Sequence, residues 1–314
     1  MTPVIDVPIG ILTPIVSVVP RNHGDWEHGA GLAELVAIAE AADRLGFHHL
    51  TCSEHVAVPP AIAEARGGTY WDPLPTLGYL AARTSQIRLA THVLVIGYHH
   101  PLGIAKQYGT LDLVSGGRLI LGIGVGTLEE EFRLLGVPFE GRGARADEAI
   151  AALRASLSLE RPVWSGTFYQ YDDMIVRPCA VQQRVPVWIG GKTRRSLRRA
   201  IEHGDAWVPV KMEPSELATA LAWARDSEPW QERKNPIDVV LAPEYAIDPL
   251  GQPQRTVDVL GELLDIGATM LNVHLLGTSL PHYLDELAAM AELCTSVRQS
   301  TGSALAAAES PGSN

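Results

Sequence analysis

The 314-residue sequence predicts an α/β protein, a (β/α)8 TIM barrel with insertion segments. Eight short apolar runs recur along the chain, and most are followed by a helical pattern, which is typical of this barrel. The runs are continuous rather than alternating, as expected for parallel strands covered on both faces. The hydrophobic content of 46% at this length permits one large core. A doubly wound parallel sheet is the alternative architecture.

The first half of the sequence contains four of the apolar runs, Ile9–Thr13, Phe47–Cys52, Ile87–Ile96 and Leu119–Val125. Helices are predicted between them over Gly31–Leu45, Asp72–Thr84 and Pro101–Leu113. Gly46 follows the first of these helices, as a helix-ending residue does. Asp72 and Pro73 fit the N-cap and the first helical position of the second.

The second half contains the other four runs, Val185–Ile189, Ala206–Val210, Ile237–Ala242 and Met270–Leu276. Helices are predicted near Arg145–Leu159, from Thr193, and over Pro281–Val297. The fourth and fifth runs are too far apart for one helix, so residues 160–184 are predicted to form an insertion with strand-like segments at Phe168–Tyr171 and Ile175–Pro178. We expect a single domain over residues 1–300 and a disordered, Ser/Gly/Ala-rich tail over 301–314.

Charge and composition limit the partners. Twenty-five Lys and Arg against 36 Asp and Glu give a net charge of −11, which argues against general binding to nucleic acid or to anionic membranes. No apolar run approaches the ~20 residues of a membrane helix, and the N-terminus lacks a basic region, so we expect a cytoplasmic protein. Three scattered cysteines do not form a disulfide framework or a zinc site.

Paired histidines at His48–His49 and His99–His100 raise the question of a metal. Adjacent residues in a strand point to opposite faces, so His48 and His49 are not expected to share an ion. No carboxylate or cysteine follows at a ligand spacing. We therefore predict no metal site.

Residues that follow the apolar runs are the candidates for chemistry, because sites in these barrels lie where strands end. Glu54-His55 follows the second run, and a carboxylate beside an imidazole can transfer protons or bond a cofactor. The competing interpretation is a capping acid and a packed histidine. His92, late in the third run, needs a polar partner, and is either a core residue or part of the site.

Glycines end the fourth run at Gly122, Gly124 and Gly126, followed by Thr127. Glycine at a strand end lets a flat ligand approach the backbone. As a dinucleotide-binding fingerprint the pattern is weak, since the third glycine is missing from its required place. Glu129-Glu130-Glu131 next along the chain is interpreted as the acidic first turn of a short helix.

Gly190-Gly191-Lys192 begins the most informative segment, which carries five cations between residues 192 and 199. It joins a strand end to a helix N-terminus, where free amides, the helix dipole and nearby cations bind anions. We predict phosphate binding by Gly190, Gly191 and Lys192, with added charge from Arg194 and Arg195. The competing interpretation is a solvated basic helix face, which we expect for Arg198 and Arg199.

The order of these motifs resembles the bacterial luciferase-like monooxygenase superfamily from residue 8 to about 297. The resemblance is carried by Thr91-His92-Val93-Leu94-Val95, Ser115-Gly116-Gly117-Arg118, Leu121-Gly122-Ile123-Gly124, Leu135-Gly136-Val137-Pro138-Phe139 and Pro186-Val187-Trp188-Ile189-Gly190-Gly191. Within the superfamily the chain looks most like the branch that uses the deazaflavin coenzyme F420.

The resemblance implies a flavin-type ring at the C-terminal face of the barrel, near Glu54-His55. It places a non-proline cis peptide at His92-Val93, behind the ring, and the cofactor phosphate at Gly190, Gly191 and Lys192. Two departures stand out. Glu54 replaces the family's usual Asp, and Thr127 stands where the sugar-phosphate dehydrogenases carry an acid, which puts a glucose-6-phosphate dehydrogenase role in doubt.

The function that the resemblance implies is an F420-dependent oxidoreductase that moves a hydride between the cofactor and a small organic substrate. His55 would transfer a proton or contact the ring, with Glu54 orienting it. One alternative is a flavin mononucleotide (FMN)-dependent monooxygenase supplied with reduced flavin by a separate reductase. Another is a non-catalytic cofactor-binding barrel. The resemblance also implies a homodimer.

Overall fold

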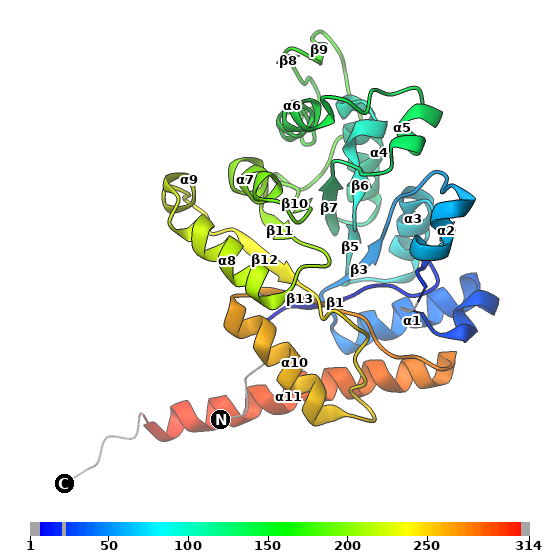
Figure 1. Ribbon diagram of the computed structural model, residues 1–314, viewed down its shortest axis with the longest axis vertical. Coiled ribbons are helices and arrows are strands. Elements are labelled where there is room, and N and C mark those ends of the chain that lie inside the picture. Colours follow the sequence, from blue (N-terminus) through cyan, green and yellow to red (C-terminus); the bar gives the residue numbers. More distant parts are fainter. Residues whose placement is uncertain (1–6, 21–22, 309–314) are drawn as a thin grey trace.

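The computed structural model describes residues 7–20 and 23–308, which form a closed barrel of eight parallel strands surrounded by helices (Figure 1). The pairing of β10 with β7 closes the sheet, which excludes the open doubly wound alternative. The predicted (β/α)8 fold is thus confirmed. The barrel strands are β1 (Ile9–Ile11), β3 (His49–Cys52), β5 (Arg88–Thr91), β7 (Leu119–Gly124), β10 (Val187–Gly190), β11 (Ala206–Val208), β12 (Asp238–Leu241) and β13 (Met270–Val273).

Helices cover the outside of the barrel, and two begin or end as their sequences predict. The Asp72 carboxylate accepts from the Leu74 amide at the start of α3, and Gly46 ends α1 with a φ of +80°. The main helices are α1 (Leu32–Leu45), α3 (Pro73–Arg83), α4 (Pro101–Val114), α6 (Arg142–Arg154), α7 (Arg194–His203), α8 (Pro214–Arg225), α10 (Pro253–Ile266) and α11 (Leu280–Ala308).

Short elements decorate the loops at the strand ends. They are β2 (Ser17–Val18) paired with β4 (Thr69–Tyr70), the 3-10 helices η1 (Asp25–Gly29) and η2 (Ile96–Tyr98), and the helices α2 (Pro60–Arg66), α5 (Glu129–Leu134) and α9 (Glu228–Gln231). The part of the predicted tail over 301–308 continues α11, while 309–314 lie outside the described residues. No helix in the described part of the chain is both long and apolar enough to cross a membrane.

The third apolar run is divided rather than continuous. β5 ends at Thr91, a cis peptide joins His92 to Val93, and β6 (Leu94–Val95) resumes pairing with β7. The cis bond implied by the resemblance is therefore present. The run is split because its backbone bulges between two short pieces that share one neighbouring strand.

The predicted insertion contains a small hairpin of β8 (Trp164–Ser165) and β9 (Gln170–Tyr171). The Glu148 carboxylate on α6 accepts from the amides of residues 167, 168 and 169, which fixes the turn of this hairpin. Ile175–Pro178 is not a strand, contrary to the sequence-based expectation. Its Val176 amide donates to the Glu160 carbonyl instead of a strand partner.

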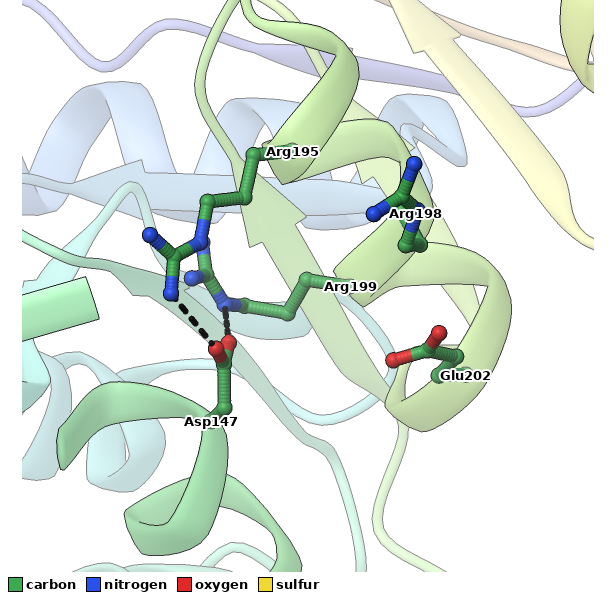
Figure 2. A pocket seen from close by; sticks show the side chains of 5 residues that line it. All are labelled: Asp147, Arg195, Arg198, Arg199 and Glu202. Atoms are coloured by element: carbon green, nitrogen blue, oxygen red, sulfur yellow. Dashed lines mark hydrogen bonds and ion pairs between the residues drawn. The ribbon is translucent and has the colours of Figure 1, made fainter. Parts of the chain in front are cut away.

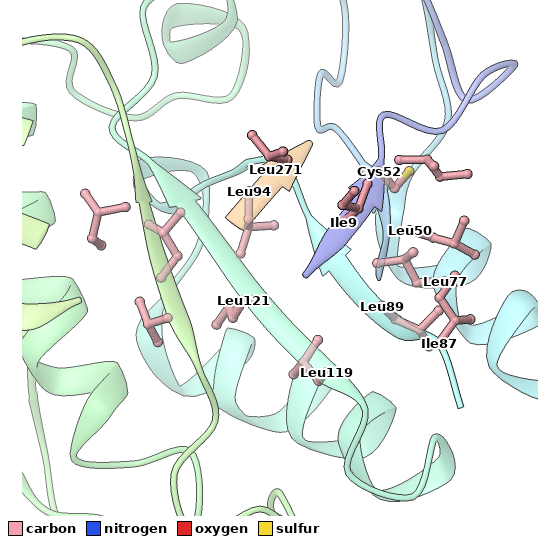
Figure 3. Close-up of a cluster of buried hydrophobic side chains, with 14 of the residues drawn as sticks. Ile9, Leu50, Cys52, Leu77, Ile87, Leu89, Leu94, Leu119, Leu121 and Leu271 are labelled. Carbon is pink, nitrogen blue, oxygen red and sulfur yellow. The ribbon is translucent and has the colours of Figure 1, made fainter. Parts of the chain in front are cut away.

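Two apolar clusters hold the barrel together. The larger fills the space between the sheet and the helices, with Leu50, Leu89 and Leu121 among its fully buried members (Figure 3). The smaller fills the barrel itself and consists of Ala90, Ile120, Trp188, Ala206, Val208, Val240 and Met270. The interior of the barrel is thus packed, and space for chemistry remains at its ends.

The base of the barrel holds a histidine pair that the sequence interpretation placed on opposite faces. Nδ1 of His48 lies 2.9 Å from Nδ1 of His49, because His48 precedes the strand and escapes its alternation. Nε2 of His49 bonds the Asn272 side-chain oxygen at 2.6 Å. The buried His49 ring occupies space that only a glycine leaves, since a Cβ at Gly10 would lie 2.1 Å from it.

This pair makes stability depend on pH. Burial lowers the pKa of His48 to about 4, so the unfolded chain, with a histidine pKa of about 6.5, takes up the proton first. The free energy of unfolding therefore falls as the pH drops from about 6.5 towards 4. The His48→Gln side chain can still donate to His49 but does not titrate. Between pH 7 and pH 4.5 we expect this variant to lose about 2 kcal/mol less unfolding free energy than the wild type does. Urea unfolding at the two pH values measures this difference, and equal losses would contradict the assignment.

Candidate functional site

The C-terminal ends of the strands bring the predicted site residues to one mouth of the barrel. His55 follows β3, His92 and Val93 follow β5, Gly124 ends β7, and Gly190 ends β10. Parallel strands place these ends at the same edge, which is where barrel enzymes carry their chemistry. The mouth is the candidate active site.

The partner of His55 is Glu131 rather than its neighbour Glu54. Nδ1 of His55 lies 2.7 Å from Oε2 of Glu131, on α5. The ring of Tyr70 packs edge-on against His55 with centroids 4.5 Å apart. The His55 side chain is 19% exposed, so the imidazole is held on two sides and still reaches the solvent.

Glu131 is the functional candidate that sequence reasoning missed. It was interpreted as part of an acidic helix start, yet it is only 1% exposed, while Glu129 beside it is exposed. Helical spacing places it three residues after Leu128, which is also buried. That spacing is the signal that identifies it, because a carboxylate on a buried stripe requires donors.

Glu54 has a different task from the one expected. Its Oε2 accepts from the Val95 amide at 2.6 Å, and its Oε1 lies 2.7 Å from Nε2 of His99. Both carboxylate oxygens are therefore engaged away from His55. Glu54 ties the loop after β3 to β6, so it orients the segment that follows the cis bond and not the imidazole beside it.

Val93 occupies the space that the strand-end glycines leave. A Cβ at Gly124 would lie 2.6 Å from one γ-methyl of Val93, and a Cβ at Gly190 would lie 3.0 Å from the other. Gly126, with a φ of +82°, leaves room for Phe132 and Val95 in the same way. Because these three positions lack side chains, other side chains of the protein fill the space, and Val93 is held at the mouth in this way. Direct cofactor contacts of Gly124, Gly126 and Gly190 stay predictions.

His92 precedes Val93 in the bulge between β5 and β6, and hydrogen bonds fix the backbone there. Its carbonyl oxygen accepts from the Ser53 hydroxyl at 2.8 Å, and the Thr91 hydroxyl donates to the Gly122 carbonyl at 2.7 Å. Burial lowers the pKa of His92 to about 4. The imidazole is therefore neutral at pH 7 and presents one donor and one acceptor nitrogen.

The Gly-Gly turn after β10 is followed by a cavity that two cations help to line. Gly191 adopts a φ of +121°, and its carbonyl accepts from the Trp207 indole at 3.0 Å. Beyond it Lys192 and Arg194 line a cavity of about 320 Å³ against α8, which we call the α7–α8 cavity. Its other lining residues are Met212, Ser215, Glu216, Thr219 and Ala220. Within the described chain, neither cation has a carboxylate within 4.0 Å.

The rest of the basic segment is bound to α6. Arg195 and Arg199 both contact the Asp147 carboxylate, at 3.2 and 2.5 Å (Figure 2). Arg199 is only 4% exposed, so the expectation that it lies on a solvated face is wrong, whereas Arg198 is exposed as expected. The ion pair with Asp147 holds α7 against α6. Arg195 thus has a protein partner, and its cofactor role stays a prediction.

Thr127 lies at the rim, where its hydroxyl accepts from the Arg66 guanidinium at 3.2 Å. This contact links α2 to the loop after β7. Among the described residues, no group of three or more His, Cys, Asp or Glu side chains is arranged to hold a metal ion.

The seating of Val93 gives a double-mutant test. We expect Gly124→Ala to cost about 2 kcal/mol of unfolding free energy, because its methyl group overlaps Val93. The same substitution in a Val93→Ala background should cost at least about 1 kcal/mol less, since the overlap is gone. Gly103→Ala is the control, since a methyl group meets nothing within 4 Å there. Urea unfolding measures the cost of Gly124→Ala in each background. Equal costs would refute the contact between Val93 and Gly124.

Sequence relatives include enzymes of two cofactor classes. An F420-dependent glucose-6-phosphate dehydrogenase of Microbacterium testaceum is 31% identical over 195 residues, covering 60% of this chain and 56% of its own. The oxygenase component of a flavin-dependent trigonelline monooxygenase of Acinetobacter baylyi is 28% identical over 174 residues, covering 54% and 46%. An uncharacterized protein of Mycobacterium tuberculosis is 29% identical over 199 residues, covering 60% and 68%.

Solved structures share the fold along almost the whole chain. The monooxygenase RslO1 of Streptomyces bottropensis superposes with a TM-score of 0.72 at 24% identity, covering 91% of this chain and 98% of its own. The F420-dependent tetrahydromethanopterin reductase of Methanopyrus kandleri gives 0.69 at 18%, covering 91% and 97%. Residues 13–248 match the family described as luciferase-like monooxygenase. The chain therefore belongs to the luciferase-like monooxygenase family, a family of oxidoreductases.

Proposed function

We propose that the protein is an F420-dependent oxidoreductase that transfers a hydride between the deazaflavin and a small organic substrate. The observation that carries the proposal is the α7–α8 cavity, where Lys192 and Arg194 meet no carboxylate within 4.0 Å in the described chain. In a protein of net charge −11, two such cations beside a Gly-Gly turn fit a phosphorylated cofactor.

The residues at the barrel mouth fit such a cofactor as well. Val93, seated on Gly124 and Gly190, offers an apolar support at the mouth for a flat ring. Glu216 also lines the cavity, and its Oε2 accepts from the Glu213 amide at 3.1 Å, so this carboxylate is engaged within its own helix turn.

When bound, the deazaflavin supplies the hydride chemistry, and the chain provides the surroundings. Lys192 and Arg194 bind the phosphate, Val93 supports the ring, and His55 exchanges the substrate proton. A small-molecule substrate would reach the mouth at His55, whose side chain is 19% exposed. Thr127, where sugar-phosphate dehydrogenases carry an acid, argues for a substrate other than glucose 6-phosphate.

An FMN-dependent monooxygenase is the second candidate, because the same cavity suits the FMN phosphate. The trigonelline relative, named as an oxygenase component, supports it. In that case a separate reductase would supply the reduced flavin. For either cofactor we propose a homodimer.

Cofactor titration of the purified protein tests both candidates. We expect F420 to bind more tightly than FMN, with Lys192→Ala and Arg194→Ala each weakening binding about tenfold through loss of a charged phosphate contact. Lys234→Ala, an exposed cation after α9, removes the same charge and should leave the affinity unchanged. Fluorescence quenching gives the Kd values. Tight FMN binding without F420 binding would overturn the first candidate, and equal affinities of the variants would overturn the phosphate site.

A further inference from the structure

We propose that Glu131 is the positioning residue of the active site, which fixes His55 with its proton on Nδ1 and its Nε2 free for the substrate. The inference rests on the proposed function for its role in turnover. It concerns a carboxylate that lies 76 positions from His55 in the sequence and to which the sequence analysis assigned no role at the site.

Four donors converge on the Glu131 carboxylate. Oε1 accepts from the amides of Val56 at 2.5 Å and Ala57 at 3.1 Å. Oε2 accepts from Nδ1 of His55 at 2.7 Å and from the Tyr98 hydroxyl at 2.8 Å. Because a carboxylate has no proton to give, the Nδ1 atom must be the donor in its bond. A neutral His55 then carries its lone pair on Nε2.

Tyr98 and the loop amides keep this carboxylate in place. Burial and the adjacent Glu131 raise the pKa of Tyr98 well above its usual range, so the phenol stays protonated and keeps donating. The ring of Tyr98 packs edge-on against Phe132 with centroids 4.9 Å apart. Glu131 is thus anchored by η2 on one side and by the loop after β3 on the other, and its geometry does not depend on a bound ligand.

The free Nε2 is the atom that this arrangement prepares for chemistry. Within the described chain it has no hydrogen-bond partner, and the side chain is 19% exposed at the mouth. If the substrate is an alcohol oxidised to a carbonyl, the bound cofactor would supply the hydride acceptor, and Nε2 of His55 would accept the hydroxyl proton. With the opposite tautomer Nε2 already carries a proton and accepts nothing, so an incorrectly held His55 is inactive as a base.

A purely structural carboxylate is the competing explanation, since Glu131 also fixes the Val56 and Ala57 amides. The two explanations differ at the imidazole. A structural role predicts loss of stability without a preferred tautomer of His55. The positioning role predicts a fixed tautomer in the protein without cofactor, and its loss when the carboxylate becomes an amide.

The test is the nitrogen chemical shifts of His55 in protein labelled with ¹⁵N-histidine, at pH 7.5 and without cofactor. We expect a protonated Nδ1 and an unprotonated Nε2 in the wild type. Glu131→Gln should shift the population towards the Nε2-protonated form, because an amide can donate to Nδ1. Glu129 is an exposed acid on the same helical turn, so Glu129→Gln is the control. It should leave the His55 nitrogen shifts at their wild-type values. Tyr98→Phe keeps the carboxylate, so it should retain the Nδ1-protonated form of His55. This variant is the replacement test if Glu131→Gln does not fold.

Turnover adds a second readout once a substrate is known. We expect Glu131→Gln to lower kcat about 100-fold, as the loss of an oriented base does, while cofactor Kd stays unchanged. Glu131→Asp should recover part of the loss. The inference is overturned if His55 of the wild-type protein is protonated on Nε2, or if Glu131→Gln leaves the nitrogen shifts of His55 unchanged. Because the shifts need no cofactor, they test it even if neither F420 nor FMN binds.

Discussion

Burial of the Glu131 carboxylate is the constraint on which the site depends. A charged group that is 1% exposed is tolerable only with its hydrogen bonds satisfied, and here four donors come from two segments outside its own helix. The loop after β3, the 3-10 helix η2 and the helix α5 must therefore meet at one point. Their meeting holds the imidazole of His55 in a single orientation.

The opposite wall of the mouth is built by packing instead of charge. The Val93 side chain fits between Gly124 and Gly190. The ends of β7 and β10 thus leave room for a side chain that follows β5. Glu54 ties down β6 directly behind it. The two walls use separate carboxylates, Glu131 for the imidazole and Glu54 for the bulge. Sequence adjacency conceals this division, because Glu54 stands next to His55 and bonds elsewhere.

Local patterns predicted the fold well because each strand and helix is encoded by neighbouring residues. All eight runs became barrel strands, and the caps at Asp72 and Gly46 lie where their chemistry requires. The site was predicted only in part, since its contacts join distant segments. The candidate residues His55 and the basic turn lie after strands, as their positions in the sequence predict, but the His55–Glu131 bond spans 76 residues. The pairing of Arg199 with Asp147 spans 52 residues and was equally invisible to local reasoning.

Under the proposed function, a phosphorylated deazaflavin would bind with its phosphate at Lys192 and Arg194 and its ring between Val93 and His55. A crystal structure of the protein with F420 tests this most directly. We expect phosphate density in the α7–α8 cavity and the reactive edge of the ring facing Nε2 of His55. Phosphate density beside Arg195 and Arg198, on the other side of α7, or a ring that does not reach His55 would contradict it.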